Sequence, residues 1–177
     1  MARINSKKKG NRGELIICKI LSDHFGETFN RVPASGAIST IHKLSTSSAK
    51  TLAGDIICPD LFKFTIENKF GYEIDLYNLF QKDNGDKKKI GEFLSQSIVD
   101  CGKTVSMSPM VIYTRTRKKP LVFLLEESFS SHKDIIRQLD QYMVFNHNNV
   151  SWIVADFVEV LVKFPKDFFF EKANGGI

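Results

Sequence analysis

Cysteine is scarce in this chain, and long hydrophobic runs are missing from it. The three cysteines, Cys18, Cys58 and Cys101, lie far apart within apolar segments, with no close pair and no histidine at ligand spacing. This pattern argues against a disulfide framework and predicts reduced core cysteines in an intracellular protein. No apolar run reaches the ~18 residues of a membrane span, and no apolar signal region follows the basic N-terminus. We therefore expect a soluble protein with no membrane partner.

Tryptophan occurs once, whereas phenylalanine occurs 15 times. Packing dominated by phenylalanine suits a sheet covered by helices better than a disordered chain. The chain has no internal repeat. With 177 residues, 42% of them hydrophobic, it is long enough to bury one core, and we expect a single domain over residues 1–177.

The order of apolar patterns predicts an α/β fold. Helices are predicted at 11–25, 73–80, 90–101 and 132–145, and strands at 27–32, 55–58, 61–69, 110–114, 121–125 and 151–155. This order implies a central mixed β-sheet flanked by helices. Residues 33–53 are rich in Ser, Thr, Gly and Ala and show no periodicity. A loop of this length in a compact domain is usually functional or disordered, so we expect a flexible active-site loop there.

The first predicted helix carries a candidate functional carboxylate. Asn11 stands at the N-cap position and Glu14 follows three residues later, as in a capping box. Glu14 also shares a helix face with Ile17, Cys18 and Leu21, at the spacing of a core-facing stripe. A carboxylate at the edge of such a face requires a partner. Glu14 therefore has two compatible interpretations, as a capping residue and as a site residue.

The stretch GDIICPDLFKFTIENK holds a second set of candidates. Glu67 and Lys69 are two apart on one predicted strand, so their side chains leave the same face about 7 Å apart. If the two strands of this stretch form a hairpin, Asp55 lies across from Glu67, with Cβ atoms about 5 Å apart. Asp60 sits at the turn, roughly 23 Å from Glu67 along an extended strand. The hairpin therefore predicts that Asp55, and not Asp60, is the partner of Glu67.

These residues can support metal-assisted hydrolysis of a phosphodiester. Two carboxylates and the backbone carbonyl of Asn68 supply oxygen ligands, which suit Mg²⁺, or Mn²⁺ in its place, better than zinc. Lys69 would position or activate the attacking water and stabilise charge on the phosphate. The alternative is an Asp–Lys–Glu cluster on a half-exposed sheet, because Glu-x-Lys alone is common.

Cations gather at two places in a chain with 25 Lys and Arg against 20 Asp and Glu. Residues 1–12 form a basic N-terminal arm with five cations and no acid, and a second cluster follows the predicted strand 110–114. The members are Arg3, Lys7, Lys8, Lys9 and Arg12, and then Arg115, Arg117, Lys118 and Lys119. Such patches attract a phosphate backbone by counterion release. Each cluster alone is equally consistent with a solvated terminus or a charged turn.

Four segments, in this order, resemble the archaeal-type Holliday-junction resolvases of the PD-(D/E)XK nuclease superfamily. They are the basic start KKKGNRGE, the strand and loop FNRVPASGA, the segment GDIICPD and the strand FTIENK. The resemblance covers roughly residues 7–70, with a vaguer match around Ser95 and Gln96. The chain departs from the family at Gly54, where proline is usual, in a longer loop after Ala34, and in a C-terminal extension from about 127 to 177.

The resemblance implies a restriction-endonuclease-like fold and a metal-dependent endonuclease that cuts branched DNA as a homodimer. The family's catalytic residues correspond to Glu14, Asp55, Glu67 and Lys69. The three carboxylates among them would also hold the metal. Ser35 falls where a loop serine contributes to catalysis in some members, and Arg12 and Arg31 fall where basic residues meet the DNA backbone.

Two other functions share these features. A restriction-type or nicking endonuclease of the same superfamily would have the same site residues. A non-catalytic DNA-binding protein could keep the fold, but three carboxylates facing DNA would weaken phosphate binding unless a metal neutralised them. We therefore favour an enzyme, and we expect it to cut four-way DNA junctions in recombination or repair.

Overall fold

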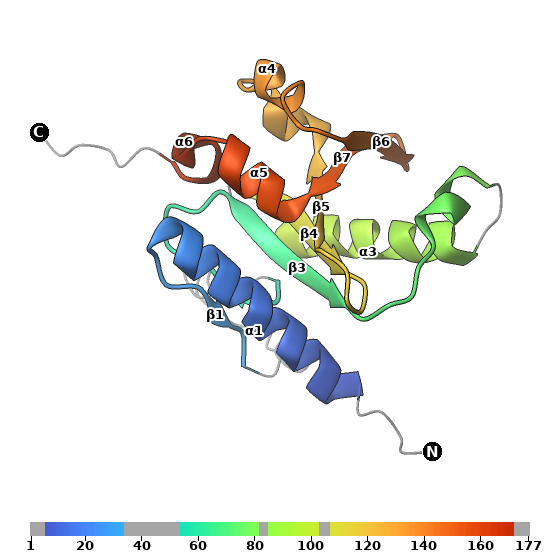
Figure 1. Ribbon diagram of the computed structural model, residues 1–177, viewed down its shortest axis with the longest axis horizontal. Coiled ribbons are helices and arrows are strands. Elements are labelled where there is room, and N and C mark those ends of the chain that lie inside the picture. The colour runs from blue at the N-terminus through green and yellow to red at the C-terminus, as the bar shows by residue number, and fades with distance from the viewer. Residues whose placement is uncertain (1–5, 34–53, 82–84, 103–106, 172–177) are drawn as a thin grey trace, which may run out of the picture.

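The protein is built on a five-stranded mixed sheet, shown in the computed structural model of Figure 1. The structure describes residues 6–33, 54–81, 85–102 and 107–171. In space the strands follow the order β3 (Phe64–Phe70), β4 (Ser108–Thr114), β5 (Leu121–Leu125), β7 (Val150–Asp156) and β6 (Tyr142–His147). β3 and β4 are parallel, and all other neighbours in this sheet are antiparallel. The predicted α/β fold, with a central mixed sheet flanked by helices, is therefore confirmed.

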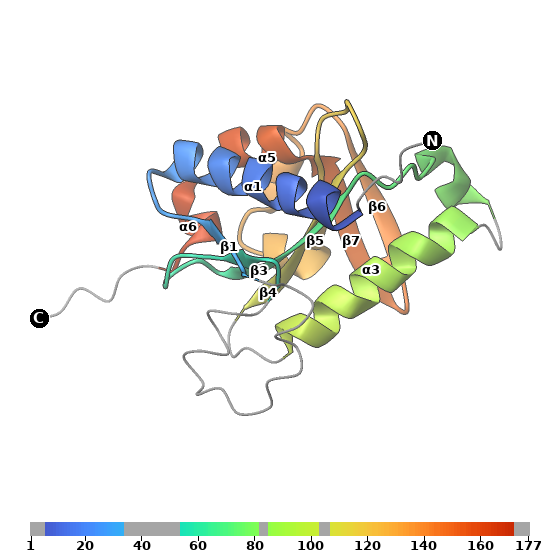
Figure 2. The ribbon, with the colours of Figure 1, turned by 90° about the horizontal axis from the view of Figure 1, so that it is seen from below.

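Helices cover both faces of the sheet (Figure 2). One face packs against α1 (Ser6–Phe25) and α5 (Phe157–Lys163), and the other packs against α3 (Gly85–Cys101). Alternation along β4 explains the two layers, because Ile112 belongs to the core under α1 and its neighbour Val111 to the core under α3. Each face of the sheet thus has a core of its own.

The helix α1 is longer than the sequence predicted. It begins at Ser6, so Asn11 lies inside the helix and is not its N-cap. The capping interpretation of Glu14 is therefore wrong, and the run of lysines before Asn11 supplies residues with good helix propensity for the extra turn. Gly13 lies where α1 meets β3, and a Cβ added there would come within 2.4 Å of Phe70 Cβ. Glycine at this position therefore allows the helix to lie close against the sheet.

The predicted hairpin before β3 forms only in part. β2 (Ile56–Ile57) pairs antiparallel with β1 (Asn30–Arg31) in a separate two-stranded sheet, and not with β3. The N–H of Asp55 nevertheless donates to the carbonyl of Ile66 on β3 at 2.8 Å. Asp55 is thus held beside β3 by a backbone hydrogen bond, although the two strands form no regular ladder.

The predicted helix at 132–145 is wrong. This part of the chain holds the single-turn helix α4 (Lys133–Ile136), which follows the 3₁₀ helix η3 (Glu126–Phe129), and then enters β6. The residues Tyr, Met, Val and Phe at the start of β6 favour a strand once β7 is available for pairing. The turn at Asn148 and Asn149, both with positive φ, brings the two strands together. The predicted helical piece at 73–80 is a 3₁₀ helix, η2 (Leu76–Phe80).

The C-terminal residues of the described chain close the core under α1. The short helix α6 (Lys166–Phe169) and the residue that follows it bring three consecutive phenylalanines into this core: Phe168, Phe169 and Phe170. The carbonyl of Phe169 accepts a hydrogen bond of 2.8 Å from the N–H of Lys63. The end of the described chain is therefore tied to the segment that leads into β3.

All three cysteines are free thiols, as predicted. Burial raises the pKa of Cys18 to about 11 and raises the pKa of Cys58 further still. Both groups therefore stay protonated and unreactive at neutral pH. None of the helices in the described ranges is both long and apolar enough to cross a membrane.

Candidate active site

Glu67 and Lys69 project from β3 on the side of the sheet that α3 covers. Their register partners on β4, Val111 and Tyr113, belong to the core on that side. Lys69 Nζ donates a hydrogen bond to Glu67 Oε1. Glu67 is buried and Lys69 is partly buried, so solvent screens this ion pair only weakly.

Asp55 reaches the same place from the segment that precedes β2. Its Oδ2 accepts a hydrogen bond of 2.8 Å from the N–H of Asn68, and its own N–H is bonded to the carbonyl of Ile66. Ile66 and Asn68 flank Glu67 on β3, so Asp55 lies beside Glu67, as the hairpin in the sequence predicted. Asp60 lies exposed at the turn after β2.

Gly54 makes this approach of Asp55 possible. Its φ is +76°, and a Cβ added there would lie 2.4 Å from the carbonyl oxygen of Ile66. A side chain would therefore be strained in its backbone and would also collide with β3. This accounts for glycine where the family that the chain resembles has proline.

The charges at this point of β3 perturb one another. Burial raises the pKa of Glu67 to about 6, and the neighbouring charge of Asp55 adds to the shift. Burial also raises the pKa of Asp55, against the hydrogen bond from Asn68 N–H, which lowers it. For Lys69, burial favours the neutral form, but the attraction of Glu67 outweighs it and the pKa is raised. Two carboxylates thus compete for one ammonium group.

Glu14 is buried on α1 and forms an ion pair with Arg31 on β1. Glu14 Oε2 lies 2.7 Å from Arg31 Nε, a close ion pair whose geometry is not that of an aligned hydrogen bond. The charge of Glu14 still raises the pKa of Asp55. Within the described ranges, no three His, Cys, Asp or Glu side chains lie close enough together to hold a metal ion. The structure therefore brings Asp55, Glu67 and Lys69 together and leaves Glu14 with Arg31.

The paired carboxylates nevertheless suit a hard divalent cation. Asp55 and Glu67 offer oxygen ligands, and their mutual repulsion is the kind that a bound cation relieves. The N–H of Asn68 points to Asp55, and the carbonyl of a strand residue points to the same edge as its N–H. The Asn68 carbonyl therefore faces the edge of β3 that Asp55 occupies, where it could complete an oxygen-rich set.

The helix α3 contributes residues that the sequence did not single out. The ring of Phe93 lies under Lys69, with its centroid 5.1 Å from Lys69 Nζ. Asp100 acts on the site through its charge, which adds to the raised pKa of both Asp55 and Glu67. Phe93 and Asp100 are seven residues apart and so share a helix face, but only the packing of α3 shows that this face covers the site.

The predicted DNA-binding residues fall into three groups. Arg12 is exposed on α1, whereas Arg31 is bound to Glu14. The second cluster forms the turn between β4 and β5, where Arg115 Nε lies 2.7 Å from Glu73 Oε2 and the other three cations are exposed: Arg117, Lys118 and Lys119. Because β3 and β4 are parallel, this turn lies at the end of the sheet where Lys69 is found.

Some predicted residues lie outside the described structure. Ser35 and the rest of the predicted loop from residue 34 onward belong to the undescribed segment 34–53. The backbones of Lys7, Lys8 and Lys9 form the first turn of α1, but their side chains are not described. Gln96, in the vaguer part of the resemblance, is exposed on α3 and donates a hydrogen bond of 2.7 Å to Asp100.

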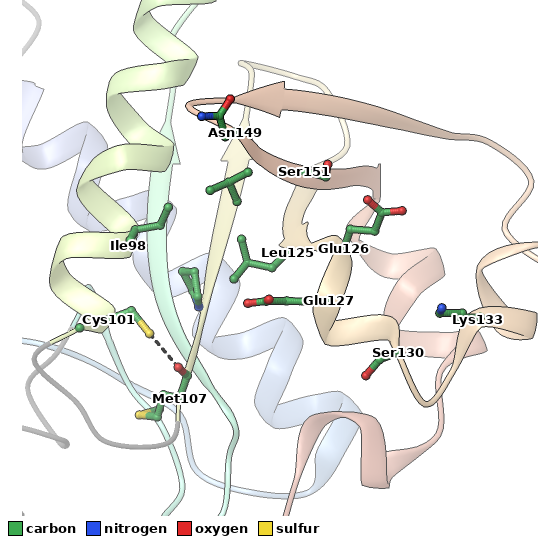
Figure 3. Close-up of a pocket in the computed structure, with 13 residues that line it drawn as sticks. Ile98, Cys101, Met107, Leu125, Glu126, Glu127, Ser130, Lys133, Asn149 and Ser151 are labelled. Atoms are coloured by element: carbon green, nitrogen blue, oxygen red, sulfur yellow. Dashed lines mark hydrogen bonds between the residues drawn. The ribbon is translucent and has the colours of Figure 1, made fainter.

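A separate cavity of about 710 Å³ lies beside the C-terminal end of α3 (Figure 3). Ile98 and Cys101 line it from α3, and Leu125, Glu127 and Lys133 line it from the opposite side. None of the predicted site residues that the structure describes lines this cavity. This cavity is therefore separate from the candidate site on β3.

Comparison with known proteins gives one match. A protein-family model described as "Phage putative PDDEXK endonuclease" matches residues 5–171. The matched region spans α1, β3 and the whole five-stranded sheet. No curated protein and no solved structure matches the chain.

Proposed function

The chain belongs to the phage PDDEXK endonuclease family, and from this premise we propose that it cuts DNA through Asp55, Glu67 and Lys69 with a divalent cation. Membership makes the protein a nuclease of the PD-(D/E)XK superfamily, whose members generally use divalent metals. It also confirms the superfamily part of the resemblance seen in the sequence. The match does not extend to the archaeal-type resolvases, so the choice of substrate remains part of the proposal.

One observation carries the proposed mechanism: a carboxylate and an ammonium group on β3 share one partly buried place with a second carboxylate that is hydrogen-bonded to the same strand. Asp55 and Glu67, with the Asn68 carbonyl, would hold Mg²⁺ or Mn²⁺. The cation would supply Lewis acidity and neutralise charge on the scissile phosphate. Lys69 would orient the attacking water and stabilise the negative charge that develops on the phosphate.

Glu14 and Ser35 keep their predicted roles within this proposal. Glu14 lies close enough to influence the pKa of Asp55, and its carboxylate could join the cation site if DNA took Arg31 from it. Arg31 would then meet the DNA backbone, as predicted from the resemblance. Ser35 remains a predicted contributor to catalysis.

We infer that the preferred substrate is a four-way DNA junction cut by a homodimer, as expected for a function in recombination or repair. The four resolvase-like segments support this choice, together with the exposed cations of the turn between β4 and β5 at the site end of the sheet. A restriction-type or nicking endonuclease would use the same site residues. Substrate geometry therefore has to be tested directly.

Cleavage assays with a labelled four-way junction and a linear duplex of matching sequence test the proposal. Each substrate is incubated with Mg²⁺, with Mn²⁺ and with chelator, using wild type, Asp55→Asn, Glu67→Gln and Asp60→Asn. We expect symmetric nicks at the junction that require the cation, a loss of about 100-fold or more for the first two variants, and nearly full activity for Asp60→Asn.

Each other outcome has a distinct meaning. Equal cutting of the linear duplex would favour a restriction-type or nicking enzyme. Binding without cutting under every condition would show a non-catalytic DNA-binding protein. A loss for Asp60→Asn as deep as that for Asp55→Asn would contradict the assignment of the site aspartate.

A further inference from the structure

Two lysines share one aromatic ring next to the site. Lys69 Nζ lies 5.1 Å from the centroid of Phe93, and Lys89 Nζ lies 5.3 Å from the same centroid. The two ammonium groups can therefore be no more than about 10 Å apart, the sum of those distances. One ring thus limits the separation between a site lysine on β3 and a second lysine on α3.

The ring of Phe93 is itself held in place. Phe93 is 6% exposed and belongs to the core between α3 and the sheet. The ring of Tyr72 packs on it, with centroids 4.9 Å apart. A ring fixed by a core and by a second aromatic side chain can restrain the cations that rest on it.

The two lysines differ in how firmly their charge is already bound. Lys69 is partly buried and bonded to Glu67, so its ammonium group has a fixed direction. The Lys89 side chain is 45% exposed and lies 3.0 Å from Glu92, one turn further along α3. An exposed ion pair of this kind is worth only about 0–1 kcal/mol. Lys89 can therefore exchange Glu92 for an incoming anion at little cost.

We propose that Phe93 is a positioning residue for Lys69, and that Lys89 binds a DNA backbone phosphate adjacent to the one at the catalytic site. This inference rests on the proposed nuclease function and extends its substrate contacts to α3. The phosphates of one DNA strand form a regularly spaced row of negative charges. Two cations held on one ring match neighbouring positions in such a row, so they would fix the strand lengthwise across the site.

The role of Lys89 is tested by DNA binding without catalysis. Wild type and Lys89→Gln are titrated with the labelled four-way junction in chelator at several salt concentrations. Lys89→Gln should weaken binding several-fold and make the dependence of log affinity on log salt shallower by about one. Lys19→Gln is the matched control, because Lys19 is an exposed helix lysine paired with Asp23 at 2.8 Å. Equal affinities for the two variants would overturn the assignment of Lys89.

The role of Phe93 is tested by cleavage kinetics. Phe93→Leu should lower kcat about tenfold, because Lys69 loses the face of the ring that orients it. Phe145→Leu is the matched control, since Phe145 is also 6% exposed and lies in the same core but belongs to β6, at the opposite edge of the sheet from Lys69. Phe93→Tyr, which keeps the ring, should recover most of the loss.

The outcomes separate this inference from the proposed function. Equal kcat values for Phe93→Leu and Phe145→Leu would show that Phe93 serves only in packing and would overturn its positioning role. Circular dichroism at the assay temperature restricts the comparison to folded variants, and Phe93→Met, which also lacks the ring, gives a second measure if Phe93→Leu does not fold. A wild type that binds but never cuts would end the nuclease proposal, while the binding titrations would still decide the role of Lys89.

Discussion

At Glu67, burial and the charge of Asp55 act in the same direction. Both favour the protonated carboxyl group, and together they move its pKa from an ordinary 4.5 to about 6. The folded protein therefore holds this proton more tightly than the unfolded chain does. The stabilisation that comes from the proton is complete below pH 4.5 and is lost as the pH rises through 6.

Because the proton on Glu67 stabilises the folded protein only at low pH, Glu67→Gln should change how stability depends on pH. A shift of this size corresponds to about 2 kcal/mol. The variant should therefore gain up to about 2 kcal/mol in free energy of unfolding, relative to wild type, as the pH rises from 4.5 to 7.5. Urea unfolding in chelator at several pH values measures the difference, and Glu126→Gln, at an exposed glutamate, supplies the baseline. A difference that does not change with pH would contradict the raised pKa.

Gly54 is the residue on which the position of Asp55 depends most directly. Gly54→Ala should cost about 1–3 kcal/mol from backbone strain alone, and the collision with the Ile66 carbonyl should also displace Asp55 and abolish cutting. Gly26→Ala separates the two effects, because Gly26 has a similar φ of +70° but open space around it. We expect Gly26→Ala to lower thermal stability and to leave cleavage in place. Full cleavage by Gly54→Ala would show that Asp55 does not need this approach.

Among the elements, the contact of α1 with β3 depends on a second glycine. Gly13→Ala should push α1 away from Phe70 and destabilise the fold by about 1–3 kcal/mol, as overpacking does. Gly10→Ala, in the same helix but with nothing near its Cβ position, should instead stabilise it by up to about 1 kcal/mol. Thermal unfolding of the two variants measures this difference in sign. Equal effects would mean that α1 is not packed closely at Gly13.

Some of the strands could be predicted from the sequence, and others could not. The strands β4, β5 and β7 were predicted because each is a short apolar run bounded by turn residues. β6 was missed because a Tyr-Met-Val-Phe run suits a helix as well as a strand until β7 lies beside it. The pairing of β1 with β2 joins residues on either side of the segment 34–53, and no local pattern encodes such a contact.

In the candidate site, too, some residues could be grouped from the sequence and others could not. Asp55, Glu67 and Lys69 could be grouped from the sequence because they lie within one short stretch whose turn sets their spacing. The ion pair between Glu14 and Arg31 and the contact of Phe93 with Lys69 could not, because each joins elements that only the tertiary packing brings together. Gly54 was seen as a departure from the family, but its cause became clear only from the approach to β3.

At the scale of the whole molecule, the sheet ends at two very different strands. β3 carries the site at one edge, while β6 forms the other edge and, within the described chain, pairs only with β7. β6 contains no Lys, Arg, Asp or Glu and no proline, and its Tyr142 and Val144 are 46% and 47% exposed. Proteins usually protect an edge of this kind with charge, proline or a covering element. A second copy of β6, paired antiparallel, would complete the proposed homodimer.

A lysine on this edge tests the dimer. Val144→Lys places a charge at the centre of β6 and should convert a dimer into a monomer, because two copies would bring like charges together. Size-exclusion chromatography with light scattering measures the mass, and Val162→Lys, at an exposed position on α5, is the control. A monomeric wild type would contradict the dimer, and a dimeric Val144→Lys would place its interface elsewhere.

Because each site lies at the edge of the sheet opposite β6, a dimer joined through β6 would hold its two sites far apart. Joining two copies through β6 makes a continuous sheet of ten strands, and the twofold axis of an antiparallel pair stands perpendicular to that sheet. Both copies of α3 would therefore lie on the same side of the sheet where the two β6 strands meet, and the twist that accumulates over ten strands would turn the two sites relative to each other. Strands are spaced about 4.8 Å apart, so the two sites would lie roughly 40 Å from each other. At 3.4 Å per base pair this is about twelve base pairs, or slightly more than one turn of duplex, which makes the spacing between paired nicks a direct measure of how the sheets are joined.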